Sequence, residues 1–257
     1  MNKIRIFKAG LHGGEEKIVV GNHLAGMISF SGCHLACNFC YTPETSVFKM
    51  GEDHSQGSFY DELERLVVLG AQNINLITPS HLWTHLEEPL TRFKEKYDLP
   101  LVLKVTGYEP RLLERFSKIA DVLVPDFKVF SRVAAEKVNL PLNYGAVAKA
   151  EIEDLLRLYP TPAYNSDGQL TRGILIRHLM MPGFFSDSLT IVSQLREIGY
   201  RSYFNIMTAF IDPHTHKITH PKAEELKLIC DAVLKAEMIL LVNGRRWEDV
   251  SKIAWAV

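Results

Sequence analysis

Cys33, Cys37 and Cys40 are the residues whose type and spacing most clearly predict chemistry. Three of the four cysteines in the chain lie in one short run, spaced Cys-x3-Cys-x2-Cys, and Phe39 precedes the last of them. An iron–sulfur cluster is usually held by four cysteines. Three thiolates would leave one iron of a four-iron cluster with a free coordination site, and an open position on a metal is where catalysis occurs.

Two other metal sites are compatible with the same thiols. Zinc could take His34 or His54 as a fourth ligand, but structural zinc sites usually combine two close cysteine pairs, and the sequence has no second pair. An electron-transfer cluster could take Cys230, which lies in an apolar-striped helical run where a lone cysteine usually packs as a small core residue. A disulfide framework is not expected in a long chain with so few cysteines.

The composition predicts one globular domain over residues 1–257. The chain is 47% hydrophobic and 23% charged, which suits a single core of this size. The formal net charge of −1 gives no basic excess for a nucleic-acid or membrane partner. We find no apolar run near the ~18 residues of a transmembrane helix and no signal-peptide pattern. We therefore expect a cytoplasmic protein with reduced thiols.

The elements that must position the cysteines alternate between strand-like and helix-like segments. Strands are expected over residues 27–30, 73–78, 101–105, 122–126, 174–179, 202–207 and 238–242, and helices over 58–69, 82–96, 110–118, 145–159, 187–198 and 222–235. Ser58 and Asp61 resemble a capping box for the first of these helices. Apolar strands separated by amphipathic helices indicate a parallel sheet covered by helices, either an open sheet or a barrel.

Charged residues at the strand ends are the next candidates, because active sites of parallel α/β folds lie at the carboxyl ends of the strands. Asp126 and Lys128 follow a strand and, being two residues apart, point to the same face. Arg177 and His178 lie within a strand, and alternation sends them to opposite faces. Arg177 is the better candidate to enter the site, whereas His178 is either catalytic or a buried histidine whose nitrogens have partners.

The cysteine motif resembles the cluster motif of the radical S-adenosylmethionine (SAM) enzymes. Over about residues 29–207, the sequence also resembles the branch related to the pyruvate formate-lyase activating enzymes. The strand ends at residues 73–81, 106–109, 125–128 and 176–183 carry this second resemblance. It implies an α/β fold, a partial (β/α)6 TIM-like barrel of parallel strands covered by helices, with the cluster at the carboxyl-end mouth.

The resemblance also implies the cofactors and the residues that hold them. Cys33, Cys37 and Cys40 would hold a [4Fe–4S] cluster, and the amino and carboxylate groups of SAM would chelate its remaining iron. The residues expected to bind the cofactors are Phe39, Thr78, Ser80, Lys104, Thr106, Asp126 and Lys128, and those expected to be catalytic are Arg177 and His178.

Two departures from the activating enzymes affect how SAM would be held. Those enzymes carry Gly-Gly-Glu after the second strand, where this chain reads Thr78-Pro79-Ser80. Backbone carbonyls near Thr78 and the Ser80 hydroxyl are candidates to accept from the SAM amino group. The Gly13-Gly14-Glu15 run precedes the cysteines and is expected to lie in a turn. Near the end of the third strand, Lys104 replaces an acidic residue and could meet the SAM carboxylate directly.

The activity implied by the resemblance is that of a radical SAM oxidoreductase. A reduced cluster would cleave SAM to methionine and a 5′-deoxyadenosyl radical, which abstracts hydrogen from a substrate. The implied partners are a one-electron donor of the flavodoxin or ferredoxin type and a glycyl radical enzyme or peptide substrate. A small-molecule substrate and a non-catalytic metal-binding module remain alternatives. The apolar residues 207–211 favour peptide docking, and the histidine-containing residues 212–220 favour a loop or lid over a metal site.

Overall fold

A computed structural model describes residues 3–13, 16–109 and 112–254 of the chain. Its centre is an 11-stranded sheet in the order β13-β12-β9-β8-β6-β5-β4-β2-β1-β3, with β7 paired to β8. The strands from β2 to β12 in this order are parallel neighbours. They are β2 (Ala25–Phe30), β4 (Ile74–Ile77), β5 (Leu101–Val105), β6 (Val122–Pro125), β8 (Leu170–Leu179), β9 (Tyr203–Met207) and β12 (Ile239–Val242).

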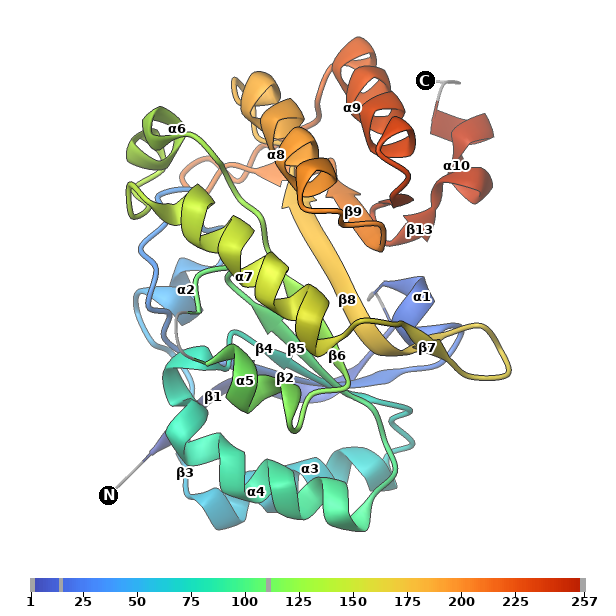
Figure 1. The fold of residues 1–257 in the computed structure, drawn as a ribbon. Coiled ribbons are helices and arrows are strands. Elements are labelled where there is room, and N and C mark those ends of the chain that lie inside the picture. Colours follow the sequence, from blue (N-terminus) through green and yellow to red (C-terminus); the bar gives the residue numbers. More distant parts are fainter. Residues whose placement is uncertain (1–2, 14–15, 110–111, 255–257) are drawn as a thin grey trace.

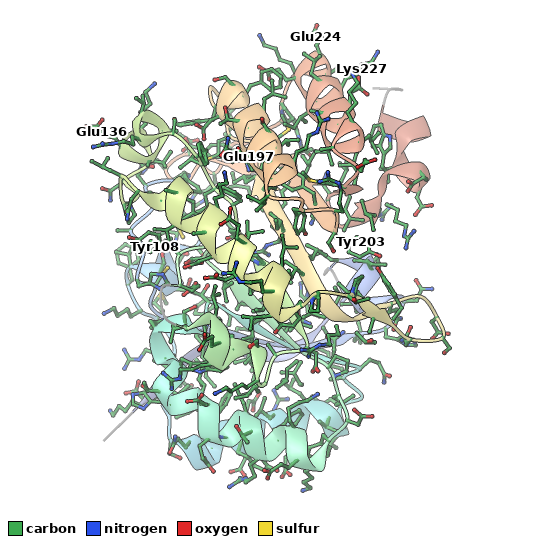
Figure 2. The ribbon with its side chains drawn as sticks, viewed as in Figure 1. Tyr108, Glu136, Glu197, Tyr203, Glu224 and Lys227 are labelled. Carbon is green, nitrogen blue, oxygen red and sulfur yellow. The ribbon has the colours of Figure 1, made fainter. Side chains whose placement is uncertain are left out.

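Helices cover the outer face of this sheet (Figure 1). They alternate with the parallel strands: α3 (Gln56–Val68), α4 (Trp83–Lys96), α5 (Leu113–Ser117), α6 (Arg132–Lys137), α7 (Tyr144–Leu158), α8 (Phe185–Glu197) and α9 (Ala223–Lys235). The sequence predicts each of these helices except α6. Their apolar faces pack on the sheet in one large core, and charged side chains such as Glu136, Glu197, Glu224 and Lys227 point outward (Figure 2). None of the described helices is long and apolar enough to cross a membrane.

The remaining elements are short or lie at the sheet edges. They are β1 (Ile4–His12), α1 (Lys17–Val20), α2 (Pro43–Ser46), β3 (Glu52–His54), the 3₁₀ turn η1 (Ser80–Leu82), β7 (Ala163–Tyr164), β10 (Phe210–Ile211), β11 (Ile218–Thr219), β13 (Arg245–Arg246) and α10 (Trp247–Ala254). β1 and β3 are antiparallel additions at one edge, and β13 is one at the other. Among the described residues the two edges do not pair, so the expected partial barrel is confirmed.

The amino-terminal end of the barrel is closed by a plug, residues 18–20 of α1. Ile18, Val19 and Val20 are buried against inward-facing strand residues: Ala25, Val102, Val122, Val124, Leu170, Leu175, Tyr203 and Leu241. The Lys17 N–H donates to the Gly244 carbonyl at 3.0 Å, which links α1 to the turn between β12 and β13. This plug leaves the opposite, carboxyl-terminal end of the barrel as the open end.

Two sequence-based expectations about helix starts need correction. The cap of α3 is Ser55, whose Oγ accepts from the Ser58 N–H at 3.1 Å, while Ser58 Oγ accepts from the Ser55 N–H at 2.9 Å. Ser58 is therefore the third residue of the helix and not its cap, and Asp61 has no capping role. The helix expected over residues 110–118 is described from Leu113, and Pro110 lies outside the described residues.

Candidate active site

The cysteine loop begins where β2 ends, at the open end of the barrel. Cys33, Cys37 and Cys40 are free, partly buried thiols. The Cys33 Sγ accepts from the Leu35 N–H at 3.4 Å. Burial raises the pKa of Cys37 to about 11, and the nearby Lys128 ammonium opposes that rise. The loop therefore presents its sulfurs in a partly desolvated setting with a cation close by.

All three cysteines line one cavity of about 670 Å³. The cavity also contains most of the residues predicted to bind the cofactors, together with the better catalytic candidate: Phe39, Thr78, Lys104, Thr106, Asp126, Lys128 and Arg177. Two predicted site residues, Ser80 and His178, are buried but do not line it. Residues separated by more than 140 positions in the sequence thus meet because parallel strands end at one edge.

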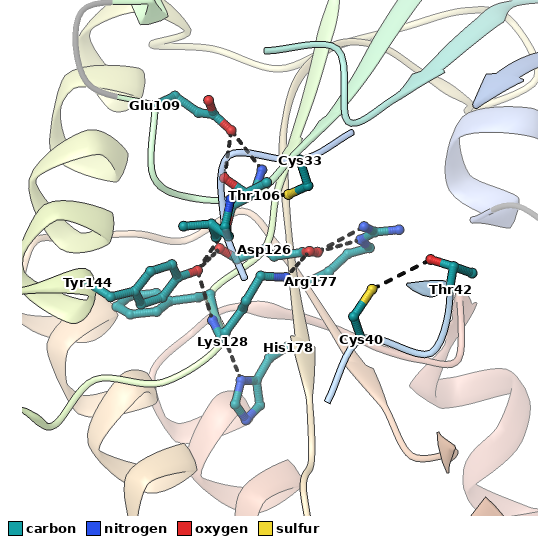
Figure 3. A network of polar contacts seen from close by, with 12 residues as sticks. Cys33, Cys40, Thr42, Thr106, Glu109, Asp126, Lys128, Tyr144, Arg177 and His178 are labelled. Carbon is teal, nitrogen blue, oxygen red and sulfur yellow. Dashed lines mark hydrogen bonds and ion pairs between the residues drawn. The ribbon is translucent and has the colours of Figure 1, made fainter. Parts of the chain in front are cut away.

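The Asp126 carboxylate forms ion pairs with two cationic side chains at the mouth of the barrel (Figure 3). Its Oδ2 accepts from Lys128 Nζ at 2.6 Å, and its Oδ1 accepts from Arg177 Nε at 2.9 Å. Burial alone would raise the pKa of Asp126, but Arg177 and Lys128 outweigh burial and lower it. Asp126 in turn raises the pKa values of Lys128 and Arg177, although burial opposes both changes. The three side chains are therefore charged, and their sum is one positive charge facing the cysteines.

Lys104 has a partner that sequence reasoning missed. Its Nζ lies 2.9 Å from Glu16 Oε2, and both side chains are almost fully buried. The other oxygen, Oε1, lies 4.0 Å from Arg177 Nη1. Burial and Arg177 lower the pKa of Lys104. A buried lysine is rarely found without a charged partner. Nothing in the sequence shows that Glu16, the residue before α1, is that partner. The structure gives Lys104 this protein partner, and its contact with SAM stays a prediction.

A scaffold of polar contacts holds the ends of β5 and β6 together. Glu109 Oε1 accepts from the Thr106 N–H and hydroxyl, each at 2.8 Å. The Tyr144 hydroxyl lies 2.8 Å from the Thr106 carbonyl and 2.9 Å from the Asp126 carbonyl (Figure 3). Gly107, with φ +73°, is required because a Cβ there would lie 1.8 Å from the Asp126 carbonyl oxygen. This scaffold fixes Thr106 and Asp126, and the sequence gives no signal for Tyr144.

Thr78 adopts a backbone conformation that threonine rarely takes. Its φ is +57°, in the left-handed region. Thr78 directly follows β4 and lines the cavity. Its N–H donates to the Lys104 carbonyl at 2.9 Å, which ties the strained residue to β5. Such strain persists only where the surroundings impose it, and it concentrates at functional sites. This strained turn places Thr78 in the lining of the cavity.

Arg177 and His178 point to opposite faces of β8, as alternation predicts. Arg177 lines the cavity, whereas His178 packs on the outer face under α8. The two His178 nitrogens lie 2.7 Å from the Phe127 carbonyl and 2.8 Å from the Ser188 hydroxyl. Burial lowers its pKa, so the ring is neutral. The structure thus separates His178 from the other candidates and gives both its nitrogens structural partners.

The donor set fits a cluster held by three cysteines. Cys230 lies in α9, is 1% exposed and packs in the main core. It does not line the cavity, so the prediction of a core residue is confirmed. Within the described ranges, no three His, Cys, Asp or Glu side chains are grouped closely enough to hold one metal ion. A four-iron cluster does not need such a group, because each thiolate binds a different iron. His34, the possible fourth ligand of a zinc site, has its Nε2 2.8 Å from the Tyr108 carbonyl.

Comparisons with known proteins concern the fold. No family model and no curated protein matches the sequence. A radical SAM methyltransferase from Sphaerobacter thermophilus has a similar structure, with a TM-score of 0.62, 12% identity, and coverage of 85% of this chain and 66% of that one. SuiB from Streptococcus suis, also solved with its precursor peptide SuiA and with S-adenosylmethionine, has a TM-score of 0.58 and 12% identity. The match covers 83% of this chain and 47% of SuiB, so the chain spans about half of that protein.

A third similar structure is anSMEcpe with bound AdoMet and a Cp18Cys peptide. Its TM-score is 0.56 at 10% identity, and the match covers 82% of this chain and 60% of that one. The chain therefore has the fold of radical SAM enzymes, which agrees with the resemblance carried by its cysteine motif.

Proposed function

We propose that this protein is a radical SAM enzyme that modifies a peptide or protein substrate. One observation carries the proposal: three free thiols from one loop share a cavity with Asp126, Lys128 and Arg177, which come from the ends of β6 and β8. In this fold the carboxyl ends of the strands form the active site. A [4Fe–4S] cluster on the three cysteines, with SAM beside it, fits this arrangement, whereas a purely structural metal would not need the buried charges.

The bound cofactors would supply a one-electron cleavage of SAM that generates a hydrogen-abstracting radical. The protein's own residues would bind and orient SAM. Lys128 and Arg177 offer cationic donors suited to a carboxylate, and Asp126 holds both of them in place. Thr78 lines the same cavity, and backbone carbonyls of its segment are candidates to accept from the SAM amino group. Leu35, Leu179 and Met181 give the cavity apolar walls that exclude water.

Two of the similar structures, SuiB and anSMEcpe, were solved with bound peptides, and this supports a peptide or protein substrate here. A glycyl radical enzyme is one protein substrate of this kind, and an electron donor of the flavodoxin or ferredoxin type would reduce the cluster. Free thiols and an oxygen-sensitive cluster suit the cytoplasm predicted from the sequence.

Anaerobic reconstitution with iron and sulfide tests the proposal. With dithionite and SAM, the protein should release 5′-deoxyadenosine and methionine even without its substrate. Cys40→Ala should abolish the product, and Cys230→Ala serves as the matched control that retains it. A reconstituted protein with full iron content that forms no 5′-deoxyadenosine would point instead to a metal-binding module. Stoichiometric zinc in the purified protein, with no iron uptake, would do the same.

A further inference from the structure

β1 has a free edge next to the candidate site. It pairs with β2 along Ile6–His12 but with β3 only along Ile4–Ile6. Within the described part of the chain, no strand covers the outer edge of Lys8–Leu11. A free edge presents alternate backbone N–H and C=O groups that can pair with another chain. Arg65 Nη2 donates to the Ala9 carbonyl at 3.4 Å, so the backbone groups of Ala9 face this edge, and an added strand would replace this long, exposed side-chain contact.

β1 runs antiparallel to β2, so its first half lies beside the carboxyl end of β2, where Ile6 pairs with Phe30 and the cysteine loop begins. The free edge starts just beyond this point, at Lys8 opposite Ser29, and runs toward the plugged end, where Leu11 pairs with Gly26. Phe7 and Lys8 line the same cavity as the three cysteines. Ala9 and Leu11 point the other way and pack on the main core. A strand added at this edge would therefore alternate its side chains between the cavity and the outside.

Apolar side chains extend this edge at the end nearest the cysteines. Phe7 is 41% exposed, and Val47, Phe48 and Met50, in the segment after the cysteine loop, are 60%, 69% and 53% exposed. The segment adjoins β1: Arg5 Nη1 donates to the Lys49 carbonyl at 3.3 Å, and Gly51 lies against the Phe7 backbone. A contiguous exposed apolar patch marks a protein-binding surface, and these four side chains lie on adjoining segments. We call Phe7, Val47, Phe48 and Met50 the apolar rim.

We propose that an extended segment of the substrate polypeptide binds as an added β-strand along Lys8–Leu11, with its own apolar side chains against the apolar rim. Backbone pairing gives such a mode affinity for many sequences, and alternate side-chain sites give selectivity. Every second side chain of the bound segment faces the cavity that holds the cysteines. The inference rests on the proposed function, because it names the form in which that function's substrate is bound.

The test uses selected peptides, since the natural substrate is unidentified. A library of random 12-residue peptides is panned under anaerobic conditions on the reconstituted protein with SAM. The tightest peptide is then synthesised with single N-methyl groups at successive positions. Strand addition predicts that the loss of affinity alternates along the peptide. N-methylation of an amide that pairs with Ala9 or Leu11 weakens binding by about 10-fold, and N-methylation of the adjacent amides has little effect. A flat profile, or one with no alternation, would overturn the proposal.

Protein variants locate the same contact. The double substitution Phe48→Ser and Met50→Ser should lower the affinity for the peptide by at least about 10-fold, because apolar anchors dominate such interfaces. Leu228→Ser is the matched control, because Leu228 is 54% exposed and lies on α9, which packs on α8 and β12 and not on β1. Hydrogen–deuterium exchange should show protection of Ala9 and Leu11 amides by the peptide. Tight binding without that protection, or no enriched peptide at all, would contradict strand addition.

Failure here is distinguishable from failure of the proposed function. SAM cleavage to 5′-deoxyadenosine is measured without peptide, so a protein that cleaves SAM yet binds no peptide at β1 keeps its enzyme assignment and loses only the docking mode.

Discussion

The two ends of the barrel interior differ sharply although the same strands build both. Along β5, β6 and β8, inward-facing Val102, Val124 and Leu175 belong to one buried cluster with the α1 plug. Two residues further along each strand, Lys104, Asp126 and Arg177 face the cavity. Residues two apart share a face, so a single strand repeat separates an apolar layer from a charged one. Apolar burial at one end can therefore stabilise the fold, while the other end carries buried charges that such stability must offset.

A substitution in the cysteine loop has the largest expected effect. It should abolish catalysis without destabilising the fold. Cys37→Ala removes one of three thiolate ligands, so the reconstituted protein should lose its iron and all SAM cleavage. Because the loop lies outside the strand core, circular dichroism and the unfolding midpoint of the iron-free protein should stay close to the unsubstituted values. Full iron content in this variant would refute the ligand assignment.

The plug should show the opposite behaviour. Ile18→Ala truncates a buried side chain at the closed end and should lower the free energy of unfolding by about 2–5 kcal/mol. At low temperature the folded variant should still take up iron and bind SAM normally, since residue 18 is not among those lining the cavity. Urea denaturation and iron analysis measure the two effects. Loss of SAM affinity in protein that is fully folded would show that the two ends are coupled.

Asp126→Asn tests the charged layer. The amide retains the shape but loses the charge that holds Lys128 and Arg177, so SAM affinity should fall by about 10- to 100-fold, roughly 1.5–3 kcal/mol. Iron content should not change. Lys128→Met should act in the same direction. Equilibrium dialysis with labelled SAM gives both affinities, and unchanged binding in both variants would mean that these charges do not contact SAM.

Glu151 offers a pH test of the scaffold behind Thr106. Its side chain accepts from the Glu109 N–H, and burial raises its pKa from 4.5 to about 8. Between these values the folded state keeps a proton that the unfolded state releases, so stability falls as pH rises. Glu151→Gln keeps the acceptor and removes the titration. Its stability relative to the unsubstituted protein should therefore rise by roughly 1–3 kcal/mol from pH 5 to pH 8. A pH-independent difference would contradict this assignment.

Cys230→Ala should have the smallest effect. Burial in α9 raises the Cys230 pKa to about 12, so the thiol is neutral and acts only by packing. The variant should lose about 1 kcal/mol of stability and keep its iron. Iron loss would instead identify Cys230 as a fourth ligand.

The sequence predicted the parts of this molecule that follow from periodicity and local motifs. The parallel strands and their helices match closely because apolar runs and amphipathic stripes are local signals. Asp126, Lys128 and Arg177 share the cavity of the cysteines, as predicted from the rule that strand ends meet in this fold, and their roles stay predictions. β1 and α1 were missed, since a mixed polar strand and a four-residue helix leave little pattern. Glu16 and Tyr144 depend on long-range packing, which no single segment of sequence encodes.

In the proposed enzyme, three cysteine ligands leave one iron of the cluster for SAM to bind. Electron paramagnetic resonance of the reconstituted, dithionite-reduced protein detects this open iron. We expect the signal of a reduced [4Fe–4S] cluster, and we expect that signal to change when SAM is added but not when methionine alone is added. A cluster signal that excess SAM leaves unchanged would mean that no iron of the cluster is open to SAM.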